Sequence, residues 1–159
     1  MNINQYLQET VEIANTISQE DLHSLYSELA QLRSNNGRLF IIGVGGSAAN
    51  ASHAVNDFRK IAKINASSPL DNVSELTARI NDDGWEHSIA DTLKISNFSS
   101  NDAILTLSVG GGSASTSLNL VRAMEFAKAE NGKVLGIVSR DGGVTAELAD
   151  SCVIIPTVN

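Results

Sequence analysis

The chain has 159 residues, of which 42% are hydrophobic and 4% aromatic, and its formal net charge is −7. A chain of this length and composition buries a core without disulfides, which favours one globular domain over a disordered segment. The balance of 11 Lys and Arg against 18 Asp and Glu argues against non-specific binding of nucleic acid. A local group of backbone amides can still attract a small anion such as a phosphate.

Cysteine content and the N-terminal sequence indicate the cellular compartment. Cys152 is the single cysteine of the sequence, which excludes an internal disulfide and a cysteine-rich zinc site. The first residues lack a basic segment followed by an apolar one, and no run approaches the roughly 20 apolar residues that a membrane helix needs. We therefore expect a cytoplasmic protein that does not contact a membrane.

The segment 1–36 has the period of helices. Apolar residues recur every three or four positions from Ile3 to Ile17, which predicts one apolar stripe on a first helix. Ser18 and Asp21 have the spacing of a capping box, so a second helix is predicted from Ser18 to about Arg33. Because these helices carry no clustered chemical groups, we interpret 1–36 as a helical packing or oligomerisation element.

From residue 37 onward, short apolar runs alternate with helical patterns. Continuous apolar runs are typical of parallel strands that are buried on both faces, with helices as crossovers between them. The sequence therefore predicts a single domain, 1–159, whose α/β core, 37–159, is a three-layer αβα sandwich with a central parallel sheet. The predicted strands are 39–42, 102–108, 133–139 and 152–155, and the predicted helices are about 48–62, 113–130 and 145–149.

Three of the predicted strands end in a glycine-rich loop, at 43–47, 108–113 and 140–143. The carboxyl ends of parallel strands meet at one edge of the sheet, where open α/β folds bind ligands. Glycines let several N–H groups approach one oxyanion, and the following helix adds its positive dipole end. Serines in the first two loops add hydroxyl donors, so the pattern favours a phosphate site.

A single glycine loop is as typical of a plain strand-to-helix turn as of a ligand site, but two similar loops favour a ligand. Neither loop has the glycine register of a dinucleotide fingerprint, and no P-loop lysine follows the second one. A nucleotide is therefore disfavoured, and a smaller phosphorylated metabolite is the predicted ligand.

Six short motifs follow one another along the chain: GVGGSA (43–48), a His followed four residues later by an acid (53 and 57), NDDG (81–84), SVGGGS (108–113), RDGG (140–143) and CVIIP (152–156). In kind and order they resemble the motifs of the sugar isomerase (SIS) domains, and within them those of the phosphoheptose isomerases. The resemblance covers about residues 5–155 and implies a flavodoxin-like fold, a phosphorylated sugar such as sedoheptulose 7-phosphate as ligand, and a homo-oligomer, a homotetramer built as a dimer of dimers.

The resemblance also implies which residues bind the substrate. In the family the second loop holds the phosphate, and an N-D-x-G segment approaches the sugar. Here SVGGGS replaces the usual STSGNS, and Val44 replaces an Asn, so backbone amides must supply more of the binding. An ordinary helix end and turn is an equal explanation of NDDG. The implied substrate-binding residues are Gly45, Gly46, Ser47, Asn81, Asp82, Ser108, Gly110, Gly111, Gly112 and Ser113.

His53 and Asp57 are four residues apart, hence on one face of the helix after the first loop. Spacing alone favours an inconsequential surface pair, and the adjacent glycine loop reverses that preference. They match the family's His and Glu, of which the acid acts as a base and the pair can ligate zinc. The resemblance therefore implies Asp57 and His53 as catalytic residues and as zinc ligands, although Asp57 is one methylene shorter than the family's Glu.

Two functions remain open at this point. The relatives continue into a C-terminal helix that adds a Gln and a His to the site, and these have no counterpart in the 159 residues. The first function is an enzyme that converts sedoheptulose 7-phosphate into a heptose 7-phosphate through an enediolate, for which a base and an acid or metal are needed. The second is a non-catalytic sugar-phosphate-binding module that acts as a regulator or as a protein-interaction partner.

Overall fold

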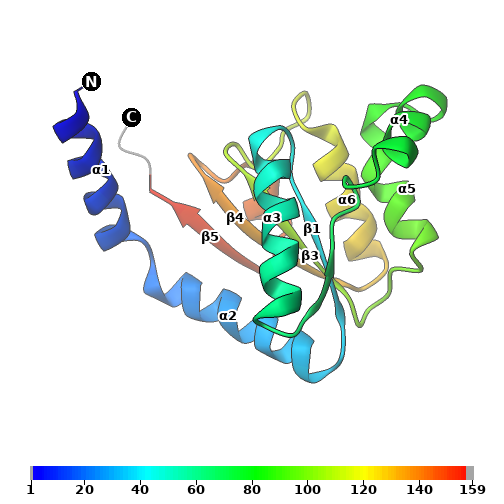
Figure 1. Cartoon of the computed structure of the whole chain (residues 1–159), viewed down its shortest axis with the longest axis horizontal. Coiled ribbons are helices and arrows are strands. Elements are labelled where there is room, and N and C mark those ends of the chain that lie inside the picture. The colour runs from blue at the N-terminus through cyan, green and yellow to red at the C-terminus, as the bar shows by residue number, and fades with distance from the viewer. Residues whose placement is uncertain (1, 157–159) are drawn as a thin grey trace.

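The computed structural model describes residues 2–156 as a five-stranded parallel sheet with helices on both faces (Figure 1). The order of the strands is β2-β1-β3-β4-β5, so the predicted α/β architecture is confirmed. The strands are β1 (Arg38–Ile42), β2 (Asn65–Ser67), β3 (Ala103–Ser108), β4 (Lys133–Ser139) and β5 (Ser151–Ile155). The helices are α1 (Ile3–Thr16), α2 (Gln19–Ser34), α3 (Gly46–Lys60), α4 (Val73–Asp82), the 3-10 turn η1 (Trp85–His87), α5 (Ser88–Ile95), α6 (Leu118–Ala129) and α7 (Gly143–Leu148).

The core consists of two apolar layers, one on each face of the sheet. Successive side chains of a strand point to opposite faces, so Leu39 and Ile41 of β1 pack in the layer that includes residues of α2 and α3. Phe40 and Ile42 pack in the layer that includes residues of α5 and α6. Burial on both faces explains the unbroken apolar run of β1, and each such side chain stabilises the fold by about 1.5–3 kcal/mol.

The amino edge of the sheet is fixed by an ion pair between Arg38 and Asp102. Their Nη2 and Oδ2 atoms are 2.6 Å apart, and the Asp102 side chain is 3% exposed. Burial alone would raise the pKa of Asp102, but hydrogen bonds from Arg38 and Ser99 outweigh it and hold the pKa below its ordinary value. The carboxylate therefore stays charged and ties the start of β1 to the turn before β3.

The start of the second helix confirms the sequence interpretation, whereas three other segments differ from it. Ser18 caps α2, because its Oγ accepts a hydrogen bond from the Asp21 N–H at 3.1 Å. Strand β2 was not predicted because it is three residues long and polar at both ends. The helices between residues 73 and 95 were not predicted either.

The helix predicted from Ser113 begins only at Leu118. Ser113 Oγ accepts hydrogen bonds from the N–H groups of Ser115 and Thr116, and the Ser113 N–H donates to the Thr116 carbonyl. Ser117 follows with φ of 55°, in the left-handed region. This local turn consumes the backbone groups that a helix would use, so α6 starts later.

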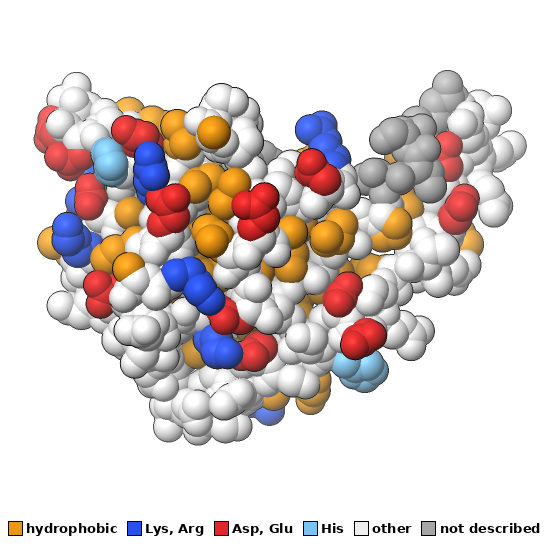
Figure 2. Space-filling model, turned by 180° about the vertical axis from the view of Figure 1, so that it is seen from behind, with side chains coloured by type: hydrophobic (Ala, Val, Ile, Leu, Met, Phe, Trp, Pro, Cys, Tyr) orange, Lys and Arg blue, Asp and Glu red, His pale blue; other side chains and the backbone are white. Residues whose placement is uncertain are grey.

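Helix α1 contains no buried residue, and the same is true of α4. The apolar stripe of α1, which includes Ile3, Leu7 and Val11, is exposed, and in Figure 1 the helix stands apart from the sheet. Within residues 2–156, no helix has both the length and the apolar character needed to cross a membrane. On the face in Figure 2, the Lys and Arg side chains lie among Asp and Glu.

Candidate functional site

A cavity of about 410 Å³ opens at the carboxyl edge of the sheet. It lies where the loops after β1, β3 and β4 meet, and the strand order reverses between β1 and β3. That reversal is the topological switch point at which flavodoxin-like sheets bind ligands. The lining residues are Val44, Ser47, Ser108, Val109, Gly110, Gly112, Ser113, Thr116, Ser117 and Arg140.

Two helices begin at this cavity. Ser47, in the first turn of α3, and Ser117, the residue before α6, both line it. Within residues 2–156, no side chain caps the first turn of either helix, whereas Asn2, Ser18 and Asn72 cap α1, α2 and α4. Uncapped N–H groups and the positive ends of two helix dipoles favour an anion in the cavity.

The second glycine loop is fixed by the start of α7. Thr145 donates two hydrogen bonds to the Gly111 carbonyl, from Oγ1 at 2.7 Å and from its N–H at 2.9 Å. The Ser108 Oγ accepts a hydrogen bond from the Gly111 N–H at 3.1 Å, and the Val144 N–H donates to the Gly112 carbonyl at 3.1 Å. The loop is therefore held in one conformation by the protein itself.

Position 111 must be glycine because the surrounding backbone leaves no room for a side chain. It has φ of 68°, and a Cβ built there would lie 1.8 Å from the carbonyl oxygen of Gly142. A Cβ on Gly143 would lie 2.3 Å from the carbonyl oxygen of Gly110. The loops 108–113 and 140–143 thus approach each other more closely than any side chain allows, and the third loop supports the second.

The structure brings together half of the predicted substrate-binding residues. Gly45 and Gly46 form the N-terminal turn of α3 beside Ser47 but are not among the residues that line the cavity, and neither is Gly111. The predicted residues that line the cavity are Ser47, Ser108, Gly110, Gly112 and Ser113.

Asn81 and Asp82 lie elsewhere, at the end of α4. Both side chains are exposed, and the Asn81 Nδ2 donates a hydrogen bond to the Asp82 Oδ1 at 2.7 Å. Asp83 ends the helix, and Gly84 follows with φ of 90°. This geometry is that of an ordinary helix end and turn, the alternative that the sequence left open.

His53 and Asp57 form the predicted pair on α3, with Nε2 and Oδ2 3.6 Å apart. Their side chains are 80% and 49% exposed, and neither residue lines the cavity. At a rise of 1.5 Å per residue, they lie about 9 and 15 Å along the helix from Ser47. A ligand anchored at the loops must therefore extend along α3 to reach them.

The described residues do not fit a complete zinc site. A catalytic zinc takes three protein ligands and one open position. His53 and Asp57 supply two donors, and residues 2–156 contain no group of three or more His, Cys, Asp or Glu side chains that could hold a metal ion. Within the part of the chain that the structure describes, His53 and Asp57 alone therefore do not complete a zinc site.

Five lining residues were not among the predicted site residues: Val44, Val109, Thr116, Ser117 and Arg140. Val44 and Val109 lie in the first two glycine loops, where the sequence indicated a loss of polar groups. Thr116 and Ser117 were assigned to the interior of a helix, whereas they lie in the turn before α6. Arg140 begins the third glycine loop, which was predicted to lie at this edge of the sheet, and that position was the available signal. Its long side chain reaches the cavity from β4.

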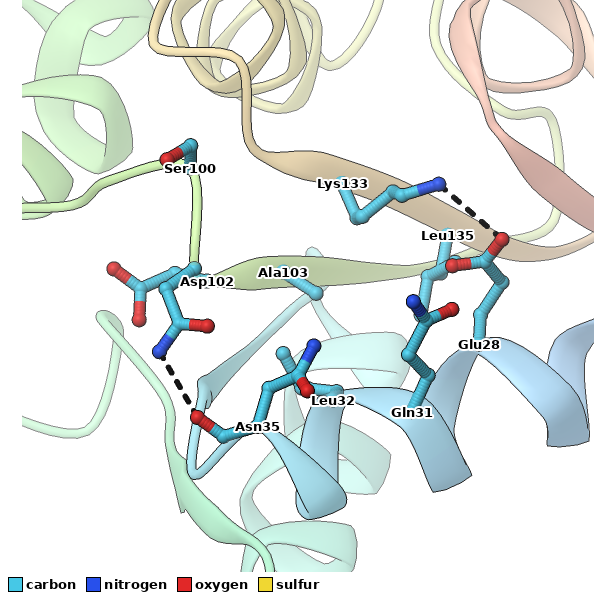
Figure 3. A pocket seen from close by; sticks show the side chains of 10 residues that line it. Glu28, Gln31, Leu32, Asn35, Ser100, Asp102, Ala103, Lys133 and Leu135 are labelled. Carbon is cyan, nitrogen blue, oxygen red and sulfur yellow. Dashed lines mark hydrogen bonds and ion pairs between the residues drawn. The ribbon is translucent and has the colours of Figure 1, made fainter.

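A second, smaller cavity of about 150 Å³ lies at the opposite edge of the sheet (Figure 3). Lys133 and Glu28 form an ion pair across it at 3.3 Å, and the Asn101 side chain donates a hydrogen bond to the Asn35 carbonyl at 3.3 Å. These contacts join α2 to the amino ends of β3 and β4. Their partners are within the protein, so the cavity is part of the packing of α2.

Solved structures share the fold of this chain. A phosphoheptose isomerase from Francisella tularensis superimposes with a TM-score of 0.86 and 22% identity, over 99% of this chain and 85% of that one. One from Neisseria gonorrhoeae gives 0.79 and 24%, over 96% and 81%. Likeness at this identity shows the fold alone. The fold and the serine-flanked glycine loops at its switch point define an α/β domain of the sugar isomerase type.

Sequence similarity narrows the class to a family. No protein-family model matches the chain. The phosphoheptose isomerase of Helicobacter pylori (strain ATCC 700392 / 26695) is 32% identical over 144 residues, which covers 87% of this chain and 72% of that protein. The chain belongs to the phosphoheptose isomerase family.

Proposed function

We propose that the protein is an aldose–ketose isomerase that converts sedoheptulose 7-phosphate into a heptose 7-phosphate. The observation that carries the proposal is the cavity at the switch point, where two uncapped helix N-termini and the hydroxyls of Ser47 and Ser113 converge. These groups suit a phosphate, and the family's name supplies the sugar.

The phosphate and the reacting carbons are at opposite ends of a heptose 7-phosphate. With the phosphate in the cavity, the extended sugar lies along α3 toward His53 and Asp57, and this accounts for the pair lying outside the cavity. Asp57 takes a proton from C1 of the ketose, and its carboxyl, which can exchange with solvent, delivers a proton to C2. His53 Nε2 gives a proton to O2 and takes one from the O1 hydroxyl, so that C1 becomes the aldehyde carbon. His53 Nε2 and Asp57 Oδ2 are 3.6 Å apart, so both side chains can reach one enediolate.

The proposal includes a homo-oligomer, a homotetramer arranged as a dimer of dimers. The exposed apolar stripe of α1 supports it, because an amphipathic helix is stable when that stripe is covered. The exposure of His53 and Asp57 supports it as well, since a neighbouring copy over α3 would exclude water from the reacting carbons. Zinc belongs to the proposal only as an ion that His53 and Asp57 would bind together with donor groups from elsewhere.

Turnover of sedoheptulose 7-phosphate tests the proposal. We expect the wild-type protein to form an aldose phosphate and the Asp57→Asn variant to lose activity by at least about 100-fold, since general-base catalysis contributes about 10²–10⁴-fold. Asp91→Asn, on α5 and outside the cavity lining, removes the same charge and should leave turnover unchanged. Equal turnover in Asp57→Asn and wild type would refute the role of Asp57.

A non-catalytic module is the second candidate, and the high exposure of His53 and Asp57 is the observation that favours it. In that case sedoheptulose 7-phosphate would raise the melting temperature of the protein without being converted. The same assay, followed by a thermal-shift measurement, separates the two functions.

A further inference from the structure

The guanidinium of Arg140 lies at the candidate site, and residues 2–156 provide no partner for its positive charge. Arg140 follows β4 at the carboxyl edge and lines the cavity, where it is the one Lys or Arg among the described lining residues. Its Nη1 lies 3.8 Å from the place of a Cβ on Gly110, so the guanidinium lies against the second glycine loop. Within residues 2–156, no hydrogen bond or ion pair engages its side chain, whereas Arg38, Arg79 and Arg122 each pair with a carboxylate.

The backbone of Arg140 is held in an unfavourable conformation. Its φ is 57°, in the left-handed region, which is unfavourable for a residue with a Cβ. The preceding Ser139 donates two hydrogen bonds to the Val109 carbonyl, from Oγ at 2.8 Å and from its N–H at 3.2 Å. The Gly142 N–H then closes a turn onto the Ser139 carbonyl at 3.0 Å.

The nearest acidic neighbour along the chain does not neutralise this charge. Asp141 Oδ1 accepts a hydrogen bond from the Gly143 N–H at 3.2 Å, which directs the carboxylate to its own loop. The protein as a whole carries a net charge of −7, so a local cation strengthens the attraction of a phosphate to the cavity. Arg140 supplies that cation, and a guanidinium can donate two parallel hydrogen bonds to phosphate oxygens.

We propose that Arg140 binds the substrate phosphate in the cavity that Ser113 also lines and thereby selects phosphorylated over unphosphorylated sugars. This inference rests on the proposed function and adds to it a specificity-determining residue. Val109 and Gly110, on the wall of the cavity, offer no hydroxyl, and the guanidinium that lies against this wall provides the missing donors.

The Arg140→Asn variant tests this role without adding strain, because Asn tolerates the left-handed region better than other residues with a Cβ. We expect it to melt no lower than the wild type. Its Kd for sedoheptulose 7-phosphate should rise about 10- to 100-fold, the effect of losing hydrogen bonds between charged groups. Its binding of inorganic phosphate should weaken as well, and Arg140→Lys should restore part of both affinities.

Lys63→Asn is the matched control. Lys63 is also a cation with φ of 57°, but it is exposed and lies outside the cavity lining. The variant removes the same charge from the same backbone conformation, so we expect both affinities to stay at the wild-type value.

Isothermal titration of wild type and variants with sedoheptulose 7-phosphate and with inorganic phosphate separates the outcomes. Wild-type affinity in Arg140→Asn, or an equal loss in Lys63→Asn, overturns the role of Arg140 and leaves the proposed function standing. A wild-type protein that binds neither probe overturns the proposed function, and the role of Arg140 with it.

Discussion

Thr106 and Thr145 are both fully buried. The Thr145 hydroxyl has a hydrogen-bond partner, whereas residues 2–156 provide none for the Thr106 hydroxyl. The Thr106 Oγ1 lies in β3 without a partner, so folding removes it from water without compensation. The Thr145 Oγ1 donates to the Gly111 carbonyl at 2.7 Å and fixes the second glycine loop. The two residues therefore make opposite contributions to stability through the same chemical group.

Replacing each threonine by valine measures this difference, because valine has the same shape and lacks the hydroxyl. We expect Thr106→Val to raise the free energy of unfolding by about 1 kcal/mol and Thr145→Val to lower it by about the same amount. The melting temperature should move by about 2–4 °C in opposite directions, measured at equal protein concentration. A loss of stability in Thr106→Val equal to that in Thr145→Val would contradict this assignment.

At the scale of elements, the third glycine loop acts as a support for the second. The loops 108–113 and 140–143 interlock so closely that a Cβ on Gly111 would lie 1.8 Å from the Gly142 carbonyl oxygen. Because Gly142 precedes α7 and Gly143 is its first residue, the position of that short helix determines the shape of the loop 108–113. The RDGG motif is thus needed for the geometry of the cavity as well as for Arg140.

Alanine at Gly111 tests this interlocking. We expect Gly111→Ala to lower the free energy of unfolding by about 2–3 kcal/mol, since it adds backbone strain and a clash with another loop. Gly46→Ala is the control, because no atom lies within 4 Å of its Cβ position and its φ is not positive. Chemical denaturation of the two variants should therefore separate them, and equal stabilities would show that the loops move apart readily.

Most of the elements were predictable because the strands are buried on both faces. The apolar runs of β1, β3, β4 and β5 place these strands to within one residue, and the loops after them follow from the parallel topology. Strand β2 has no such run, since Ala66 is its one buried residue. The start of α6 depends on the Ser113 hydroxyl, which accepts hydrogen bonds from the N–H groups of Ser115 and Thr116. The helix therefore begins at Leu118, and hydrophobic periodicity does not indicate this shift.

The candidate site was predictable to the same extent. Ser47, Ser108 and Ser113 were found because they flank glycine loops at strand ends. Arg140 was not assigned a role, because the direction of a long side chain is set by the left-handed turn at its Cα. The placement of His53 and Asp57 outside the cavity follows from the length of α3, and their function depends on what covers that helix.

Within a single chain, the apolar side chains of helix α1 are not buried against any other element. Its stripe of Ile3, Leu7 and Val11 is exposed, and apolar Tyr26 of α2 is exposed as well. A second copy of the chain can cover these side chains by the hydrophobic effect alone. We therefore expect the assembly to depend on α1 more than on the sheet.

Leu7→Glu tests this dependence. A charge in the middle of the stripe should dissociate the assembly into smaller species, measured by size-exclusion chromatography with light scattering. Gln8→Glu adds the same charge to the adjacent residue, which is also exposed but lies outside the stripe, and should leave the mass unchanged. A wild-type protein that is monomeric at micromolar concentration would refute the role of α1.

In the proposed reaction, a sugar phosphate is bound at the carboxyl edge of the sheet, and Asp57 takes a proton from C1 of the sugar and delivers one to C2. Proton NMR of sedoheptulose 7-phosphate incubated with the protein in D₂O tests this claim directly. We expect one C1 proton to exchange for deuterium and the aldose product to carry deuterium at C2, with no exchange in Asp57→Asn. Binding of the sugar phosphate by the wild type with neither exchange nor aldose product would contradict the claim, and the protein would then be a sugar-phosphate-binding module.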